Sequence, residues 1–209
     1  MTTNEEFVSQ AIIEEAPCKH PSKCSRKAKL AAGYCMKHLE ENTGLVLKKS
    51  QIKGAGLGLF AGTKMIPAGT QIPYVGDELT LDEFHERYPS GLSDYVLEYK
   101  GVYYDARSTQ SCLSRYVCDH RLFKKVGDTL YMYDKLEKNA SLTAGSPPFV
   151  NVLRDVMPGE ELLTDYGEGY WKNRPGFSLE KPPAQTQQKS KKKLKNSSIF
   201  FSKSMNKLV

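Results

Sequence analysis

The chain has 209 residues, of which 39% are hydrophobic, and its formal net charge is +6. This length accommodates one ordinary domain with extensions, and the apolar content is sufficient to fill a core of that size. No apolar run approaches the roughly 18 residues of a membrane span, and the first ten residues lack the features of a signal peptide, so we expect a soluble intracellular protein.

The charge is distributed unevenly along the chain. Residues 1–16 carry four Glu and no base, and residues 17–38 carry six bases and no acid. Residues 39–180 carry 16 bases and 20 acids, whereas residues 181–209 carry eight Lys and no acid. The centre is therefore mildly acidic between basic flanks, which suits a lysine-rich partner at the centre and a polyanion at the edges.

Residues 1–16 are only weakly patterned, and we expect them to be mobile. Residues 17–40 then contain a candidate zinc module, because 21 residues with four ligands can fold around one tetrahedral ion without a core of their own. The candidate ligands, spaced C-x5-C-x10-C-x2-H, are Cys18, Cys24, Cys35 and His38. His20 is a weaker candidate because it is so close to Cys18. The alternative is a helix with incidental reduced cysteines, since disulfides are disfavoured inside cells.

Residues 45–175 show the pattern of a β-rich domain, in which short apolar runs alternate with Gly, Pro and Asp. The predicted strands are 57–61, 71–75, 95–99, 102–104, 149–153 and 162–163. The clearest helix is predicted at 80–88, where Thr80 and Glu83 form a capping-box pattern. Residues 111–117 are a second helical candidate.

Two further stretches carry distinctive motifs. Residues 53–61, KGAGLGLFA, place three glycines in five positions, and backbone without Cβ atoms lets a ligand approach main-chain N–H and C=O groups. No G-x-G-x-x-G follows a strand and opens a long helix, which argues against a dinucleotide-binding fold. Residues 158–171, PGEELLTDYGEGYW, predict a turn, a short buried strand and then Tyr166 beside a glycine. Taken alone, the second stretch is more typical of a turn after a strand with a packed tyrosine than of a functional site.

Together these stretches resemble the SET-domain protein lysine methyltransferases, whose domain opens with Gly-x-Gly-Leu-Phe-Ala and closes with Gly-Glu-Glu-Leu and Asp-Tyr-Gly. The resemblance covers residues 45–175. It implies a β-rich (α+β) SET-type fold of several short-stranded sheets with a C-terminal pseudoknot, preceded here by the small Cys/His module. The implied activity is transfer of a methyl group from S-adenosylmethionine to a lysine side chain of a protein, with histones as candidate substrates.

The resemblance also implies roles for individual residues. Tyr166 matches the family's closing tyrosine, whose hydroxyl lies beside the methyl path, and Tyr74, in Tyr-Val-Gly, matches a tyrosine along the lysine channel. Both are predicted catalytic residues, and the alternative for each is a core tyrosine. The residues predicted to contact the cofactor are Ala55, Gly56 and Leu57, largely through main chain, with Arg115, Cys118, Asp119 and Trp171. Trp171 is predicted either to stack on the adenine or to anchor the core.

The sequence departs from the family pattern at Cys118, which stands where the family has an asparagine that grips the cofactor. A thiol is a weak donor and acceptor, so its presence would cost about 1–3 kcal/mol in cofactor binding. Residues 121–138 look like an insertion before Asn139. The cysteine cluster that follows the domain in many relatives is missing, and the available replacements are Tyr170, Trp171 and Phe177.

Residues 176–209 form a basic tail, in which 182–195 lack an apolar pattern and are expected to be disordered. The run KSKKKLK at 189–195 is typical of a nuclear-import patch or a weak nucleic-acid contact, although such tails are often simply solvated. We therefore expect a nuclear or otherwise cytoplasmic protein. A non-catalytic SET-like protein that binds a peptide or the cofactor is the alternative that Cys118 favours. A nucleic-acid-binding protein is a third hypothesis, weakened by the lack of interleaved aromatic residues.

Overall fold

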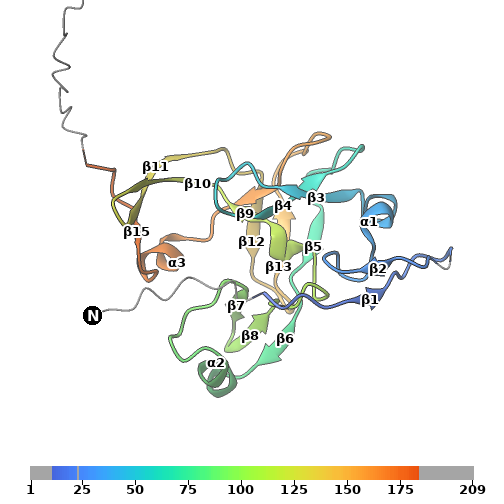
Figure 1. Cartoon of the computed structure of the whole chain (residues 1–209), viewed down its shortest axis with the longest axis horizontal. Coiled ribbons are helices and arrows are strands. Elements are labelled where there is room, and N and C mark those ends of the chain that lie inside the picture. The colour runs from blue at the N-terminus through green and yellow to red at the C-terminus, as the bar shows by residue number, and fades with distance from the viewer. Residues whose placement is uncertain (1–10, 23, 184–209) are drawn as a thin grey trace, which may run out of the picture.

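The structure, a computed structural model, describes residues 11–22 and 24–183 (Figure 1). Short strands dominate this part of the chain and form six small sheets. The β-rich class with few helices, as predicted from the sequence, is confirmed. In chain order the strands are β1 (Ala16–Pro17), β2 (Lys27–Ala28), β3 (Leu45–Lys49), β4 (Leu57–Ala61), β5 (Gln71–Pro73), β6 (Asp77–Leu79), β7 (Val96–Tyr99), β8 (Val102–Asp105), β9 (Cys118–Asp119), β10 (Arg121–Val126), β11 (Thr129–Lys135), β12 (Ala140–Thr143), β13 (Phe149–Val152), β14 (Leu163–Thr164) and β15 (Phe177–Ser178).

The helices follow from local signals of different strength. α2 (Leu81–Arg87) begins where predicted, because Thr80 accepts from the Glu83 amide and the Glu83 side chain accepts from the Thr80 amide. The second candidate is a single 3-10 turn, η1 (Ser114–Tyr116). α1 (Met36–Thr43) and α3 (Glu168–Lys172) were not predicted. Both are short enough for their apolar periodicity to be weak, so tertiary packing rather than propensity selects them.

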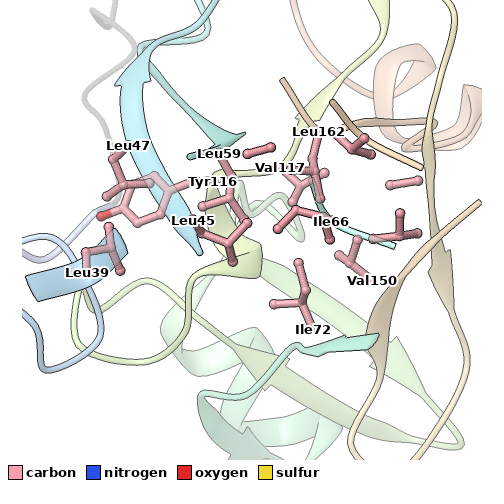
Figure 2. Packing of buried hydrophobic residues seen from close by; sticks show 14 of the residues in the cluster. Leu39, Leu45, Leu47, Leu59, Ile66, Ile72, Tyr116, Val117, Val150 and Leu162 are labelled. Atoms are coloured by element: carbon pink, nitrogen blue, oxygen red, sulfur yellow. The ribbon is translucent and has the colours of Figure 1, made fainter. Parts of the chain in front are cut away.

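One hydrophobic core joins the central strands to the N-terminal part of the chain. Leu39 of α1 lies beside Leu47 and Tyr116, while Leu162 and Val117 lie near the middle of the cluster (Figure 2). All of these side chains are buried. Burial of a leucine side chain contributes about 1.5–3 kcal/mol, so α1 is held mainly by Leu39. The core therefore fixes the Cys/His module, which ends in α1, to the strands that carry the site.

The segment 160–164 hydrogen-bonds to three segments that precede it in the sequence. Leu162 donates its amide to Leu59 of β4, β14 pairs in parallel with β9, and the Leu163 amide donates to the side chain of Asn139. Hydrogen bonds to three separate segments are what the predicted C-terminal pseudoknot requires. A parallel pair of two residues each is held by this enclosure rather than by its own ladder.

The segment predicted to be an insertion forms a hairpin of β10 and β11, and β15 pairs in parallel with β11. Figure 1 shows this three-stranded sheet and α3 at the opposite end of the molecule from α1. Phe123 of β10 packs against Trp171 and Phe177, with ring centroids 4.5 and 5.2 Å apart. The hairpin thus brings the aromatic residues after the Asp-Tyr-Gly motif back onto the domain.

The ends of the chain are described in part. Residues 11–16 hydrogen-bond to the loop at 107–110, so this part of the segment expected to be mobile is anchored. Residues 184–209, which include the predicted import patch and most of the predicted disordered stretch, lie outside the described residues. In the described ranges, no helix has the length and apolar character needed to cross a bilayer.

Candidate active site and metal centre

Three segments that are distant in sequence meet around Cys118. Its thiol lies 3.6 Å from the carbonyl oxygen of Leu57, at the end of the glycine stretch. The parallel pairing of β9 with β14 brings the Asp-Tyr-Gly motif alongside, so that the Tyr166 hydroxyl donates to the carbonyl of Val117 at 2.7 Å. The Tyr166 amide donates to the Asp119 carboxylate at 2.7 Å. The structure therefore brings together the predicted glycine stretch, residues 117–119 and Tyr166.

The hydroxyls of Tyr166 and Tyr74 share a buried environment. Burial raises the pKa of Tyr166 well above its usual value, and the neighbouring Cys118, Tyr170 and Tyr74 raise it further. Burial likewise raises the pKa of Tyr74. The Tyr74 hydroxyl donates to the carbonyl of Tyr95 at 2.8 Å. Each hydroxyl has one hydrogen, which is used on a carbonyl, so only oxygen lone pairs remain for a ligand.

A buried ionic network holds the backbone of the Asp-Tyr-Gly motif. The Arg121 guanidinium donates to Asp119 at 2.8 Å and to Asp165 at 2.7 Å. Asp119 also accepts from the Arg121 amide, and Asp165 accepts from the Gly167 amide. Arg121 is 2% exposed, so removing one partner would leave a buried charge uncompensated. The network fixes the direction in which Tyr166 leaves β14.

Aromatic rings form one side of the site. The Tyr170 ring lies 4.8 Å from that of Tyr166, and the Trp171 ring lies parallel to Tyr166 at 6.4 Å. Arg174 covers Tyr170, with its guanidinium 3.9 Å from the ring centroid, and pairs with Asp94 at 2.6 Å. These contacts connect α3 to the loop before β7.

A groove of about 270 Å³ begins beside Tyr170 and runs between α3 and the β7–β8 hairpin. Its lining includes Tyr170, Asn173 and Arg174 on one side and Val96, Glu98 and Tyr103 on the other. β7 lies at the edge of its sheet, because the strand order is β6-β8-β7. The groove does not include the glycine stretch or Cys118, and Tyr170 connects it to the aromatic side of the site.

The glycine stretch forms an exposed turn before β4. Gly54 and Gly56 have φ of 91° and 76°, and a Cβ at either position would meet nothing within 4 Å. The turn is closed by the Ala55 amide, which donates to Ile52. A Cβ at the third glycine, Gly58, would overlap the buried Glu161 carboxylate. The first two glycines thus leave open space above the backbone, and the third admits Glu161.

Three further residues predicted to contact the cofactor, Arg115, Cys118 and Trp171, have their polar groups buried. Arg115 is buried and donates to the carbonyls of Ala106 and Arg107, at 2.7 and 3.1 Å, so its guanidinium holds a neighbouring loop. Burial raises the pKa of the Cys118 thiol to about 12, so the thiol is protonated at neutral pH. The indole N–H of Trp171 is buried and has no hydrogen-bond partner among the described residues.

The four predicted metal ligands converge although they span 21 residues. Their ligand atoms all lie within 4.8 Å of one another. The Nδ1 atom of His38 is 3.5 Å from both Cys18 Sγ and Cys35 Sγ, and the Cys24 and Cys35 sulfurs are 3.9 Å apart. Tetrahedral zinc with ordinary bond lengths requires about 3.6 Å between N and S ligands and about 3.8 Å between two S ligands. The chain therefore presents the ligands near the spacing of a zinc site.

Two further polar side chains lie against the His38 ring. Nε2 of His38 is 3.9 Å from the Glu41 carboxylate, and the His20 ring stacks on His38 with centroids 3.8 Å apart. Metal-bound histidines commonly direct their second nitrogen at a carboxylate. The weaker candidate His20 bonds Ser22 through Nδ1 at 2.6 Å, and its Nε2 lies 3.7 Å from the Glu41 carboxylate. It therefore groups with His38 and Glu41 and not with the three cysteines.

Three residues beside the site, Arg121, Tyr95 and Tyr170, have no individual role predicted from the sequence. The sequence places Arg121 at the start of the predicted insertion 121–138 and Tyr95 in the predicted strand 95–99. Tyr170 lies in α3 and Tyr166 precedes that helix, so their ring contact depends on the turn at Gly167 and not on a helical spacing. No local sequence pattern predicts the ion pairs of Arg121, because its partners Asp119 and Asp165 come together through the pairing of β9 with β14.

Comparison with known proteins gives one family match. The profile of the SET domain family matches residues 56–167. A curated relative, the histone-lysine N-methyltransferase EZH2 of Chaetomium thermophilum, is 29% identical over 140 residues, which are 60% of this chain but only 8% of that protein. The chain thus spans a small part of this relative.

Two solved structures are similar to this chain in part. The methyltransferase domain of human PR domain-containing protein 2 is 19% identical, with a TM-score of 0.42, and covers 79% of this chain and 99% of that one. A humanized mutant of the Chaetomium thermophilum Polycomb Repressive Complex 2, bound to the inhibitor GSK126, is 25% identical with a TM-score of 0.41. That match covers 63% of this chain and 15% of the other. Both TM-scores are below 0.5, so the overall likeness is limited.

Proposed function

Because the chain belongs to the SET domain family, we propose that it transfers a methyl group from S-adenosylmethionine to a lysine side chain of a protein. The observation that carries the proposal is the meeting of Tyr166 with residues 117–119 and Leu57, since it unites the family's closing tyrosine with the segments proposed to bind the cofactor. S-adenosylmethionine supplies a methyl group that is already activated by sulfonium.

The residues present fit this cofactor. The open, exposed turn at Gly54 and Gly56 leaves room for a ligand against the backbone, and Ala55 to Leu57 would provide main-chain contacts. The unpartnered indole N–H of Trp171, at the aromatic side of the site, is a donor that a ligand would satisfy. Asp119 would contribute through its backbone, because its carboxylate is used by Arg121 and Tyr166.

The two tyrosine hydroxyls would orient the lysine nitrogen. Their hydrogens are donated to the carbonyls of Val117 and Tyr95, so each oxygen offers lone pairs to an amine N–H. Their raised pKa values keep both phenols neutral, which avoids a negative charge that would trap the ammonium form. Neither tyrosine acts as a base at neutral pH, so the lysine must lose its proton to solvent before transfer.

The buried aromatic surroundings would favour that proton loss. Neutralising a lysine with a pKa of about 10.4 costs about 4.6 kcal/mol at pH 7, and desolvation of the ammonium lowers that cost. The rings of Tyr74, Tyr166 and Tyr170 would enclose the lysine stem. The groove along β7 suits an extended peptide, because an edge strand has free backbone groups that can pair with it.

The Cys/His module would hold a structural zinc ion through Cys18, Cys24, Cys35 and His38. Four protein ligands close a tetrahedral site and leave no open position, which is typical of structural rather than catalytic zinc. We propose residues 17–40 as the metal module, 45–175 as the SET domain, and the segments 1–16 and 176–209 as its flanks. Histones as substrates, nuclear location and a nucleic-acid contact of the basic tail belong to the same proposal.

The proposal is tested with labelled S-adenosylmethionine, core histones as substrate, and the protein alone to detect self-methylation. Tyr166→Phe removes one oxygen and keeps the ring, so the transfer rate should fall about 10²-fold or the number of methyl groups added should shift. Tyr133, which is 51% exposed on β11, provides the matched control: Tyr133→Phe should transfer at the wild-type rate. Equal rates and products in all three proteins would remove Tyr166 from the catalytic role.

The second candidate function is a non-catalytic SET-like protein that binds a peptide or the cofactor. The observation in its favour is Cys118, whose protonated thiol offers weaker hydrogen bonds than an amide. A wild type that binds S-adenosylmethionine or a lysine peptide by calorimetry, yet methylates no lysine-rich substrate, would support this function over the first.

A further inference from the structure

The loop at 106–113, between β8 and η1, is held on its inner side by the residues of the lysine channel. Arg115 donates to the carbonyls of Ala106 and Arg107, and its guanidinium lies 4.2 Å from the Tyr95 ring centroid. The Tyr95 carbonyl accepts from the Ala106 amide at 2.9 Å and from the Tyr74 hydroxyl at 2.8 Å. A shift of this loop would therefore move Tyr95 and the hydroxyl of Tyr74 together.

The same loop is held on its outer side by the N-terminal segment through Gln110. Its Oε1 accepts from the Gly33 amide at 2.9 Å. Its Nε2 donates to the carbonyls of Glu14 and Ala28, at 2.7 and 2.9 Å. The Gln110 side chain thus contacts three segments that lie 77 to 96 residues away in the sequence. An amide is suited to this task, because it combines an acceptor with two donors.

The backbone of the adjacent Thr109 strengthens this junction. Its carbonyl accepts from the Ala32 amide at 3.2 Å, and its amide donates to Ile12 at 2.9 Å. Ala32 has a φ of 44°, a left-handed conformation that is strained for a residue with a Cβ, and Gly33 follows with a φ of 97°. Such a conformation persists only where its surroundings hold it on both sides.

The other side of this turn is the Cys/His cluster. The Gly33 carbonyl accepts from the amide of Lys19, the residue after Cys18, and Gly33 lies two residues before Cys35. Metal ligation by Cys18 would fix the neighbouring Lys19, and ligation by Cys35 would fix the chain after Gly33. Both would hold the turn at Ala32 and Gly33, whose amides donate to Thr109 and Gln110. The contacts form an unbroken series from the metal ligands through Gln110 and Arg115 to Tyr95 and Tyr74.

We infer that Gln110 is a positioning residue, which transmits the metal-bound shape of the Cys/His module to the lysine channel through the loop at 106–113. The inference rests on the proposed function for its effect on methyl transfer, but the contact between module and loop can be tested without it. Loss of the metal and loss of the Gln110 amide interrupt the same series, so their effects should not add.

The first test is hydrogen–deuterium exchange on the full chain, without methyl donor. Gln110→Ala, and chelation of zinc from the wild type, should each raise exchange at the amides of Ala106 and Thr109 about tenfold, while residues 45–61 keep the wild-type rate. Gln71, which is exposed on β5, gives the matched control, and Gln71→Ala should leave the loop unchanged. Chelation needs no substitution and decides the question if Gln110→Ala does not fold.

The second test is steady-state kinetics on a lysine peptide. Gln110→Ala should lower kcat about tenfold and change the KM for S-adenosylmethionine less than threefold, because the loop holds Tyr74 and Tyr95 rather than the glycine turn. Chelating zinc from Gln110→Ala should cause no further loss. Unchanged exchange in the loop, an unchanged kcat, or losses that multiply would each overturn the inference. If the wild type is inactive, the proposed function fails and exchange alone decides whether the module holds the loop.

Discussion

Substitution of Asp119 by Asn tests whether the buried ionic network holds Tyr166 in place. The Asp119 carboxylate accepts three hydrogen bonds, two from the amide and guanidinium of Arg121 and one from the Tyr166 amide. Asn has nearly the same shape but only one oxygen. With that oxygen facing the guanidinium and Tyr166, the new NH₂ group would face the Arg121 amide, donor against donor.

The expected loss of folding stability follows from the hydrogen-bonding groups that the substitution leaves without partners. An unsatisfied buried N–H costs about 1–3 kcal/mol, and Arg121 also loses one of its two carboxylate partners. Breaking a buried ion pair from one side costs about 3–5 kcal/mol, and the remaining pair with Asp165 places the expected loss near the lower end, about 3 kcal/mol. For a chain of this size, the Tm should fall by about 6–12 °C.

Urea denaturation of wild type and Asp119→Asn gives the stability difference, and methyl transfer by the folded variant gives the effect on Tyr166. Asp134, an exposed residue of β11 whose carboxylate accepts from the amide of the next residue, Lys135, supplies the control. Asp134→Asn should stay within about 0.5 kcal/mol of the wild type. A loss below 1 kcal/mol in Asp119→Asn, or a transfer rate equal to that of wild type, would refute the role given to the network.

The remaining predictions concern the cofactor, the metal and pH. Cys118→Asn should tighten S-adenosylmethionine binding about tenfold by calorimetry, and weaker binding would refute its correspondence with the family's asparagine. Purified protein should carry close to one zinc per chain by metal analysis. That zinc should be lost in Cys35→Ser and kept in Cys112→Ser, whose cysteine is buried away from the cluster. The hydrogen bond from Arg154 lowers the pKa of Glu160, so this carboxylate stabilises the fold above its unfolded pKa of about 4.3 and ceases to do so as pH falls through the lowered native value. The stability gap between wild type and Glu160→Gln in urea should therefore narrow from pH 7 to pH 3, and a constant gap would contradict it.

Local sequence signals predicted those parts of the molecule whose structure depends on neighbours in the chain. The capping box at Thr80 and Glu83 places the start of α2, and the alternation of apolar runs with Gly and Pro marks most of the central strands. The spacing from Cys18 to His38 likewise predicted the four residues that converge in the Cys/His cluster. In each case a few adjacent residues satisfy one another, so the pattern is visible without a fold.

The segment after Asp119 shows where such signals end. Residues 121–138 read as an insertion, yet they form the hairpin of β10 and β11 that pairs with β15. The contact of Phe123 with Trp171 and Phe177 joins residues about 50 positions apart, which no local pattern records. The hairpin supplies the aromatic packing for the residues that follow the Asp-Tyr-Gly motif.

The family motifs, the β-rich class, the Cys/His cluster and the two tyrosines proposed for catalysis could all be predicted from the sequence. The contacts of Arg121 with Asp119 and Asp165, and those of Gln110 with the Cys/His module, could not be predicted from the sequence. These contacts join residues that are far apart in the sequence and meet only through tertiary pairings such as that of β9 with β14. A sequence motif reflects the interactions of a few neighbouring residues. Tertiary contacts such as those of Arg121 depend on how the whole core packs.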